Sequence, residues 1–276
     1  MARNAAPMDC QRRRLYLESQ WPTSATFPIQ QGIPLSPDVI SDLAPSGVLR
    51  AGINLSNFLL VTKVNSTGDP EGMAPDLAGE VATRLGVSVK YVTFKTPGEL
   101  ADAVDKNIWD IGLIGAEPQR AETIAFTPAY AEIEATYLVP SGSPLKTIED
   151  VDSAGVQIAV TARTAYGLWL DRNTKRAELI RSETLDSACE QFANDKLSAL
   201  AGLRPRLLSE LERLPGARIL DGRFTSVQQA IGTSRKNLAA AAFLRDFVEE
   251  AKASGLVAHL IARHKVRGLT VAPPAT

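Results

Sequence analysis

Residues 109–140, WDIGLIGAEPQRAETIAFTPAYAEIEATYLVP, join an apolar strand directly to a polar turn that carries an arginine. Apolar residues are dense over 110–114, and the run is broken by Gly115, Glu117 and Arg120. A short apolar run that ends in such a turn is typical of a buried parallel strand in an α/β protein. In folds of this class, ligands bind at the carboxyl ends of the strands. The stretch therefore predicts an α/β fold with a binding crevice near Arg120.

The sequence before this stretch alternates predicted strands and helices. A strand over 48–54 is followed by a loop and a helix over Pro75–Leu85, whose apolar residues recur at a spacing of four. The segment 87–94 begins with alternating apolar and polar residues, as half-buried strands do. A second helix is expected at about Gly98–Asp105. Because strands and helices alternate, the sequence predicts a right-handed parallel sheet.

After Pro140 the same organisation starts again. A connector over 141–151 contains proline and leads to further strands and helices, so we expect a second lobe of the same class. The last helices are expected to return to the first lobe. The predicted elements of this half are strands over 156–160, 197–203 and 228–234, and helices over about 161–170, Glu183–Asn194, Pro205–Leu214 and Ala240–Ala253.

The composition excludes several classes of function. With 276 residues, 45% of them hydrophobic, the chain is long enough for one large domain or two lobes. Thirty basic and 31 acidic residues leave a net charge of -1, so we expect neither nucleic acid nor an anionic membrane as a partner. Cys10 and Cys189 fit no metal-ligand spacing, and His259 and His264 miss a shared helical face. We therefore expect no metal, no cofactor and no structural disulfide.

Residues 1–38 are predicted to form an irregular tail punctuated by prolines. Arg12–Arg14 faintly resemble a twin-arginine export signal, but the apolar region of about 7–15 residues that export needs does not follow. The context of Cys10 lacks the apolar region of a lipoprotein signal, and no run approaches the ~18 apolar residues of a membrane helix. The sequence as written therefore predicts a cytoplasmic protein without membrane insertion.

The order of these segments resembles the family 3 extracellular solute-binding proteins, the substrate receptors of polar amino-acid uptake transporters. The similarity covers about residues 45–265, through VLRAGINLSNF, GMAPDLAGEVATRLGVSVKYV, the stretch quoted above, LVPSGSPLKTIEDV, VQIAV and TARTAY. It implies a periplasmic-binding-protein-like fold of type 2, in which two lobes, each a mostly parallel sheet flanked by helices, are joined by a two-strand hinge. The expected division is 39–138 and 228–276 for lobe 1 and 139–227 for lobe 2.

The resemblance also implies partners and a location. We expect a monomer that binds a small anionic or zwitterionic ligand and delivers it to an ABC-transporter permease. If the N-terminus is misassigned, the family implies a periplasmic location.

The resemblance assigns ligand-binding residues to this chain. Gly115 and Arg120 match a segment in which an arginine clamps a ligand carboxylate through paired charge-assisted hydrogen bonds. Phe58 matches an aromatic residue that often lies over the ligand, and Thr161–Tyr166 match a helix start whose N–H groups hold the same carboxylate. The expected ligand-binding residues are Asn54, Ser56, Asn57, Phe58, Gly115, Glu117, Arg120, Thr161, Arg163, Thr164 and Arg204.

Two departures from the family pattern argue against a standard α-amino acid ligand. Leu203 stands where the family has an aspartate that binds the ligand ammonium, and Arg204 follows it. An ammonium buried without its partner costs on the order of 3–5 kcal/mol. Glu117 lies in a segment about two residues shorter than in the family, and it is the alternative partner for an ammonium. Together with Arg120 and Arg163, Arg204 favours an anionic ligand such as a carboxylate or a dicarboxylate.

Each of these residues also has a structural interpretation. The three arginines are typical of solvated surface positions as well, and Glu117 is typical of an acid that stabilises a helix N-terminus. Phe58 is compatible with a core position. Thr161 or Thr164 is expected to cap the helix that follows.

Three functions are compatible with the sequence. The first is a receptor that closes on a small solute without covalent chemistry. The second is an enzyme on the same scaffold, similar to cyclohexadienyl dehydratase, with Glu117 or Glu132 as its acid. The third is a cytoplasmic ligand-sensing module. Since no nucleophile-elbow, phosphate-loop, zinc-protease or dinucleotide motif is present, the sequence favours the receptor.

Overall fold

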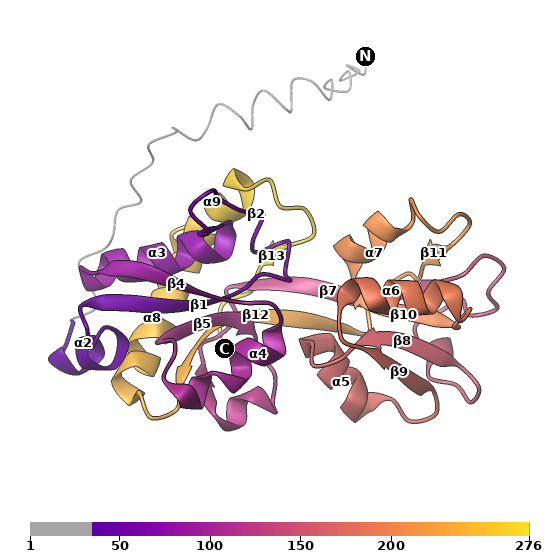
Figure 1. The fold of residues 1–276 in the computed structure, drawn as a ribbon, viewed down its shortest axis with the longest axis horizontal. Coiled ribbons are helices and arrows are strands. Elements are labelled where there is room, and N and C mark those ends of the chain that lie inside the picture. Colours follow the sequence, from indigo (N-terminus) through magenta and orange to yellow (C-terminus); the bar gives the residue numbers. More distant parts are fainter. Residues whose placement is uncertain (1–34, 276) are drawn as a thin grey trace, which may run out of the picture. The chain divides into compact units, whose positions relative to one another are not determined.

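The computed structural model describes residues 35–275, which form two α/β lobes built on one continuous sheet (Figure 1). This confirms the predicted fold class. Nearly all of the expected irregular tail lies outside the described residues. Helix α2 (Pro37–Leu43) begins two residues inside the expected tail boundary, and its start is capped by Ser36, whose side chain accepts a hydrogen bond from the N–H of Val39.

The sheet has the order β4-β1-β5-β12-β7-β10-β8-β9. Strands β4, β1 and β5 are mutually parallel, and so are β10, β8 and β9. Between these two groups lie β12 and β7, which run antiparallel to each other and to β5 and β10. The strands of this path are β4 (Ser88–Phe94), β1 (Val48–Asn54), β5 (Ile111–Gly115), β12 (Thr225–Ser234), β7 (Ala131–Val139), β10 (Ala199–Leu203), β8 (Gln157–Thr161) and β9 (Glu178–Ser182).

Strands β7 and β12 connect the two lobes, as the predicted two-strand hinge requires (Figure 1). The expected lobe boundary at 138/139 falls near the end of β7, and the boundary at 227/228 falls within β12. The exact positions of these two lobe boundaries stay a prediction.

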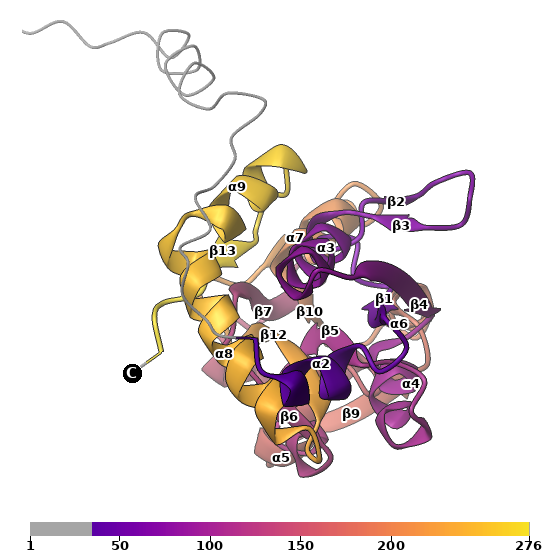
Figure 2. The same ribbon diagram turned by 90° about the vertical axis from the view of Figure 1, so that its left-hand side faces the viewer.

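The first lobe packs helices on both faces of β1 and β5, and Figure 2 shows α4 and α8 on opposite sides of these strands. Ile111 and Leu113 of β5 pack into one core, whereas Ile114 packs into another, because successive side chains of a strand point to opposite faces. The first core includes α2, α3, α8 and α9, and the second includes α4 with Trp109. These helices are α3 (Met73–Leu85), α4 (Pro97–Asp102), α8 (Leu238–Ala253) and α9 (Leu256–Arg263).

The second lobe repeats this arrangement around β8. Ile158 and Val160 pack into one core, and Ala159 packs into the other. The helices that cover this lobe are α5 (Ala165–Asn173), α6 (Leu185–Asn194) and α7 (Arg204–Glu210). Each lobe therefore has its own apolar interior.

The predicted elements differ from the observed ones mainly at their ends. The helix expected at Pro75–Leu85 begins at Met73, and the one expected at Pro205–Leu214 ends at Glu210. Two strands of the sheet path, β7 and β9, were not predicted from the pattern of residues. Strand β9 lies at a sheet edge with Glu178 and Arg181 exposed. The remaining short elements are β2 (Lys63–Val64), β3 (Pro70–Glu71), η1 (Val104–Lys106), η2 (Arg120–Glu122), β6 (Ile124–Phe126), η3 (Glu149–Val151), β11 (Arg218–Ile219) and β13 (Thr270–Val271).

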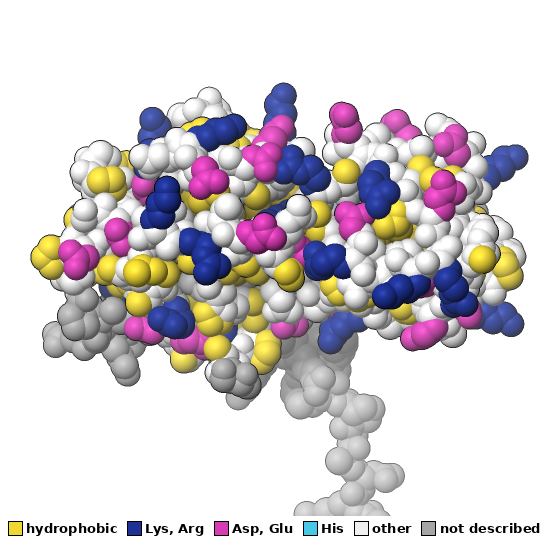
Figure 3. Space-filling model, turned by 90° about the horizontal axis from the view of Figure 1, so that it is seen from below, with side chains coloured by type: hydrophobic (Ala, Val, Ile, Leu, Met, Phe, Trp, Pro, Cys, Tyr) yellow, Lys and Arg dark blue, Asp and Glu magenta, His cyan; other side chains and the backbone are white. Residues whose placement is uncertain are grey.

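The surface carries charges of both signs. On the face shown in Figure 3, acidic and basic side chains are interspersed without a large field of one sign. This agrees with the net charge of -1 for the whole chain. Within residues 35–275, no helix has the length and apolar character needed to cross a bilayer.

Candidate functional site

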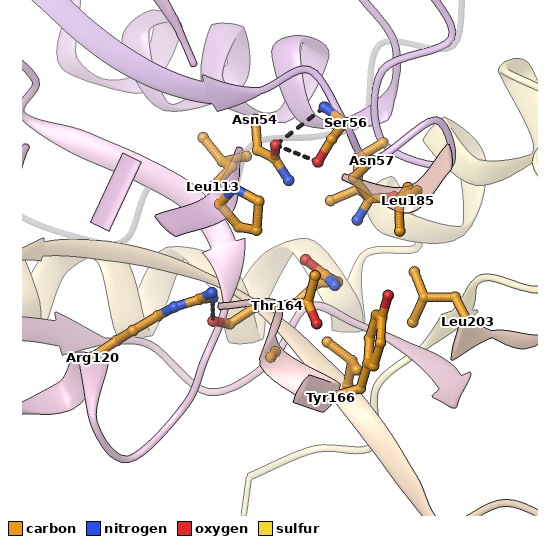
Figure 4. A pocket seen from close by; sticks show the side chains of 15 residues that line it. Asn54, Ser56, Asn57, Leu113, Arg120, Thr164, Tyr166, Leu185 and Leu203 are labelled. Atoms are coloured by element: carbon orange, nitrogen blue, oxygen red, sulfur yellow. Dashed lines mark hydrogen bonds between the residues drawn. The ribbon is translucent and has the colours of Figure 1, made fainter. Parts of the chain in front are cut away.

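A pocket lies where the carboxyl ends of β1, β5 and β10 meet the N-termini of α5 and α6 (Figure 4). It holds about 480 Å³ of empty space, part of which is open to solvent. Both lobes line it: Asn54 and Leu113 come from the first lobe, and Thr164 and Leu203 come from the second. The position is the one predicted for a ligand crevice in this class of sheet.

Six of the expected ligand-binding residues line this pocket. They are Asn54, Ser56, Asn57, Gly115, Arg120 and Thr164. The loop after β1 is held by its own asparagines: the Asn54 Oδ1 accepts from the Ser56 N–H at 3.1 Å and from its hydroxyl at 2.8 Å. The Asn57 Oδ1 accepts from the N–H of Leu59 at 3.2 Å. Segments far apart in the sequence thus meet at one site.

Arg120 is a buried cation at the edge of this pocket. Arg120 is 6% exposed, and its guanidinium donates to the backbone oxygens of Gly115 at 2.7 Å and of Arg163 at 2.8 Å. Burial lowers the pKa of Arg120 to about 10, and the charge of Glu117 opposes this shift. The guanidinium therefore stays protonated at neutral pH. Among the ion pairs of residues 35–275, none involves Arg120.

Thr164 caps helix α5, as predicted for one of the two threonines. Its hydroxyl accepts from the N–H of Gly167 at 3.0 Å and donates to the backbone oxygen of Thr161 at 2.9 Å. The first N–H groups of a helix have no partner within it, and here they belong to Ala165 and Tyr166, which both line the pocket. The helix start therefore offers N–H donors at the site.

Glu117 and Arg204 do not line the pocket, in contrast to the expectation. Glu117 is buried, forms an ion pair with Arg172 of α5, and accepts from the N–H of Gln119 at 2.9 Å. Its carboxylate is therefore engaged by Arg172 and Gln119 and does not border the pocket. The Arg204 Nε donates to the Glu134 Oε2 at 2.8 Å.

Three further expected residues also lie away from the pocket lining. Arg163 adopts a left-handed backbone with φ 58°, and its guanidinium pairs with Asp102 of α4 at 2.6 Å. It lines a neighbouring groove between the lobes. Phe58 is 40% exposed and is not a core residue. Thr161 is buried behind Thr164, whose hydroxyl it binds through its backbone oxygen.

Two polar residues of the pocket were missed at the level of sequence. Gln229 of β12 is 3% exposed, and its Oε1 has no hydrogen-bond partner in the part of the chain that the structure describes. Tyr166 is also 3% exposed; its buried hydroxyl makes no hydrogen bond of normal geometry within residues 35–275, although Thr161 and Thr164 lie near enough to lower its pKa. Burial raises the pKa of Tyr166, so its hydroxyl remains a donor. The sequence signal for Gln229 is a polar residue within an otherwise apolar strand. Buried polar groups normally form hydrogen bonds, so such a residue is expected to bind another group.

The chemistry of the lining is simple. One guanidinium, the amides of three residues and a few hydroxyls face walls of apolar side chains. The apolar lining residues are Leu60, Pro97, Leu113, Ala165, Leu185, Leu203 and Val227. The arrangement is suited to binding a small anion with an apolar part.

Known proteins share the fold. Residues 49–266 match the bacterial extracellular solute-binding proteins, family 3. A mutant of ArgBP from T. maritima is 22% identical with a TM-score of 0.67, and the match covers 83% of this chain and 100% of that one. A binding component of an ABC transporter from Wolinella succinogenes, complexed with lysine, is 21% identical with a TM-score of 0.67, over 80% and 97% of the two chains.

A third solved structure is the ancestral amino-acid-binding protein AncCDT-1, a precursor of cyclohexadienyl dehydratase. It is 19% identical with a TM-score of 0.66, over 82% of this chain and 98% of that one. No curated protein matches the chain significantly. At these identities, the solved structures show the fold alone.

Proposed function

The chain belongs to the bacterial extracellular solute-binding proteins, family 3, and on that premise we propose that it is a receptor of the ABC-transporter type for a small carboxylate-bearing solute. The observation that carries the proposal is the buried guanidinium of Arg120, which has no acidic ion-pair partner within residues 35–275 and borders a pocket between the lobes. A charge buried without a counter-ion is unfavourable, and a ligand carboxylate supplies the counter-ion.

Two groups hold the carboxylate in this proposal. A guanidinium has five N–H donors, and two backbone oxygens engage Arg120, so donors remain for a ligand. The N–H groups at the start of α5 approach from the other lobe. Since Arg120 belongs to the first lobe and α5 to the second, a carboxylate between them draws the lobes together. Ligand binding and lobe closure are then a single event.

The partners follow from the family. We propose an ABC-transporter permease as the partner that receives the solute, and a location outside the cytoplasmic membrane where the family acts. The neighbours described as ArgBP and as a lysine complex support a small, amino-acid-sized ligand. We also propose that the protein functions as a monomer. Co-purification with a permease, and fractionation of cells that express the full chain, test these two points.

The ligand is tested by thermal shift of the full chain against a library of small carboxylates, followed by calorimetry on the hits. Arg120→Ala is expected to weaken binding about 100-fold or more, because the ligand loses a charge-assisted, partly bidentate contact. The ligand affinity of Arg120→Lys is expected to lie between those of the wild type and Arg120→Ala. Arg181→Ala is the matched control, since Arg181 pairs with Asp171 and does not line the pocket. An Arg120→Ala variant that binds as tightly as the wild type would refute the clamp.

The second candidate is a dehydratase-like enzyme, which the likeness to the precursor of cyclohexadienyl dehydratase favours. Such an enzyme needs a positioned acid in its site. Within the described residues, the lining contains no aspartate or glutamate, and neither Glu117 nor Glu132 borders the pocket. The test is to incubate the full chain with prephenate and with arogenate. Product formation would show that the protein is an enzyme and would contradict the receptor function.

A further inference from the structure

The charge of the pocket lining has one sign. Across the described residues, Arg120 is the one charged side chain in the lining, and no carboxylate borders the pocket. A ligand ammonium would therefore enter a partly desolvated site beside a buried guanidinium and find no opposite charge. Like charges repel more strongly where water is excluded. The lining thus disfavours any cationic group on the ligand.

Neutral acceptors do not make up for the missing carboxylate. An ammonium has three donors to satisfy. The Oδ1 of Asn54 already accepts from Ser56, and the Oδ1 of Asn57 accepts from Leu59. The hydroxyl of Thr164 already donates and accepts within the helix cap. The side-chain acceptors at this site are thus mostly engaged by the protein itself.

Two buried polar groups of the lining, the Oε1 of Gln229 and the hydroxyl of Tyr166, make no hydrogen bond of normal geometry with the described residues. Figure 4 shows the hydroxyl end of Tyr166 directed into the space between Asn57, Thr164 and Leu203. A phenol donates to a ketone or hydroxyl oxygen, and a carboxamide oxygen accepts from a hydroxyl. These groups suit a neutral oxygen substituent on the ligand.

Arg163 and Arg204, the other two arginines expected at the site, do not line the pocket. Arg163 is paired with Asp102, and Arg204 is paired with Glu134. A single available cation matches a single carboxylate, and a second carboxylate would be buried against apolar walls at a large desolvation cost.

We infer that the pocket selects a small monocarboxylate with an apolar body and no amino group, of the 2-oxo or 2-hydroxy acid class. The inference rests on the proposed receptor function and specifies its ligand. Arg120 and the start of α5 bind the carboxylate, and the Tyr166 hydroxyl donates to the oxo or hydroxyl oxygen. The Gln229 Oε1 accepts from the hydroxyl of a 2-hydroxy acid, and residues such as Leu203 and Val227 contact the apolar body.

Matched probes test this selection on the full chain. Phenylpyruvate is compared with phenylalanine, and 4-methyl-2-oxopentanoate with leucine, because each pair differs in the group that replaces the ammonium. In whichever of the two pairs has a side chain that fits the pocket, calorimetry is expected to show that the oxo acid binds at least ~100-fold more tightly than the amino acid. Equal or tighter binding of the amino acids would overturn the inference and leave the receptor function standing. Tighter binding of succinate or 2-oxoglutarate would overturn its monocarboxylate part.

If the chain binds no carboxylate of either series at millimolar concentration, both the inference and the proposed function fail. A gain-of-function variant gives an independent test. Leu203→Asp introduces a carboxylate at the pocket wall and is expected to raise the affinity for the amino acid at least ~10-fold over Leu203→Asn, which has the same size without the charge. Circular dichroism checks that both variants fold. An unchanged preference in a folded Leu203→Asp variant would contradict the inference, and the wild-type comparison stands even if this variant does not fold.

Discussion

Replacing Arg172 by alanine is expected to weaken ligand binding although Arg172 does not line the pocket. Arg172 lies in α5 of the second lobe and pairs with Glu117, which follows β5 of the first lobe. The Glu117 side chain is 3% exposed and that of Arg172 is 40% exposed. When the lobes separate, Glu117 regains water, so loss of its partner raises the free energy of the closed state in particular.

The size of this effect follows from the two exposures. Removing one partner of a fully buried pair costs about 3–5 kcal/mol. Because Arg172 is partly solvated, we discount this to about 1–3 kcal/mol. A free energy of about 1.4 kcal/mol is tenfold in affinity, so the dissociation constant should rise about 5- to 150-fold. The Arg163–Asp102 pair, whose side chains are 56% and 53% exposed, serves as the solvent-exposed control for the Arg172–Glu117 pair. Its loss in Arg163→Ala is expected to cost less than about 1 kcal/mol.

Calorimetry on the wild type, Arg172→Ala and Arg163→Ala with the same ligand measures both effects. Glu117→Gln combined with Arg172→Ala is expected to recover part of the lost affinity, because the unpaired buried charge is gone. The reasoning is wrong if Arg163→Ala weakens binding more than Arg172→Ala, or if the double variant binds no better than Arg172→Ala alone.

Three smaller predictions concern stability and reactivity. Tyr130 is fully buried, and its hydroxyl has no hydrogen-bond partner within residues 35–275, so Tyr130→Phe should leave the unfolding free energy unchanged or raise it by up to about 1 kcal/mol in denaturant titrations. A lower unfolding free energy would show that the hydroxyl is hydrogen-bonded. Burial opposes but does not outweigh the three backbone N–H groups of residues 175–177 that lower the pKa of Asp152. The ionised Asp152 carboxylate therefore stabilises the fold above the unfolded pKa of about 3.9, and this contribution is lost as the pH falls through the pKa of the folded state. Asp152→Asn should lower the melting temperature at pH 7 but hardly at pH 2. Burial raises the pKa of Cys189 to about 11, so its thiol should react with a disulfide reagent at pH 8 far more slowly than that of the unfolded chain, and equal rates would contradict its burial.

The sequence predicts local features of this protein well, because they depend on neighbouring residues. The apolar run before Gly115 became the central strand β5, and Thr164 caps α5 as a residue of its type before a helix should. The six expected residues that line the pocket lie at strand ends, at helix starts or in the loop after β1, which the alternation of elements places on one edge of the sheet.

The pairing of charges could not be predicted in the same way. Glu117 pairs with a residue 55 positions later in the chain, and Arg204 pairs with one 70 positions earlier. No periodicity links such residues, because their contact depends on how the two lobes and the hinge strands pack. The sequence therefore identified the residues that carry charge without showing which of them neutralise one another. Gln229 was missed for a related reason: its burial follows from the pairing of β12 with β5 and β7.

This pairing changes the expected ligand more than any single residue does. Counted along the sequence, three arginines near the predicted crevice favour an anionic ligand such as a carboxylate or a dicarboxylate, and Glu117 offers a partner for an ammonium. In the structure, Asp102 neutralises Arg163, Glu134 neutralises Arg204, and Arg172 neutralises Glu117. Two of these three pairs join the lobes, so the contacts that bring the lobes together also remove charge from the neighbourhood of the pocket. Among the described residues, one buried guanidinium then remains in a lining of neutral polar and apolar side chains, and electrostatics favours a ligand with one negative charge and no positive one.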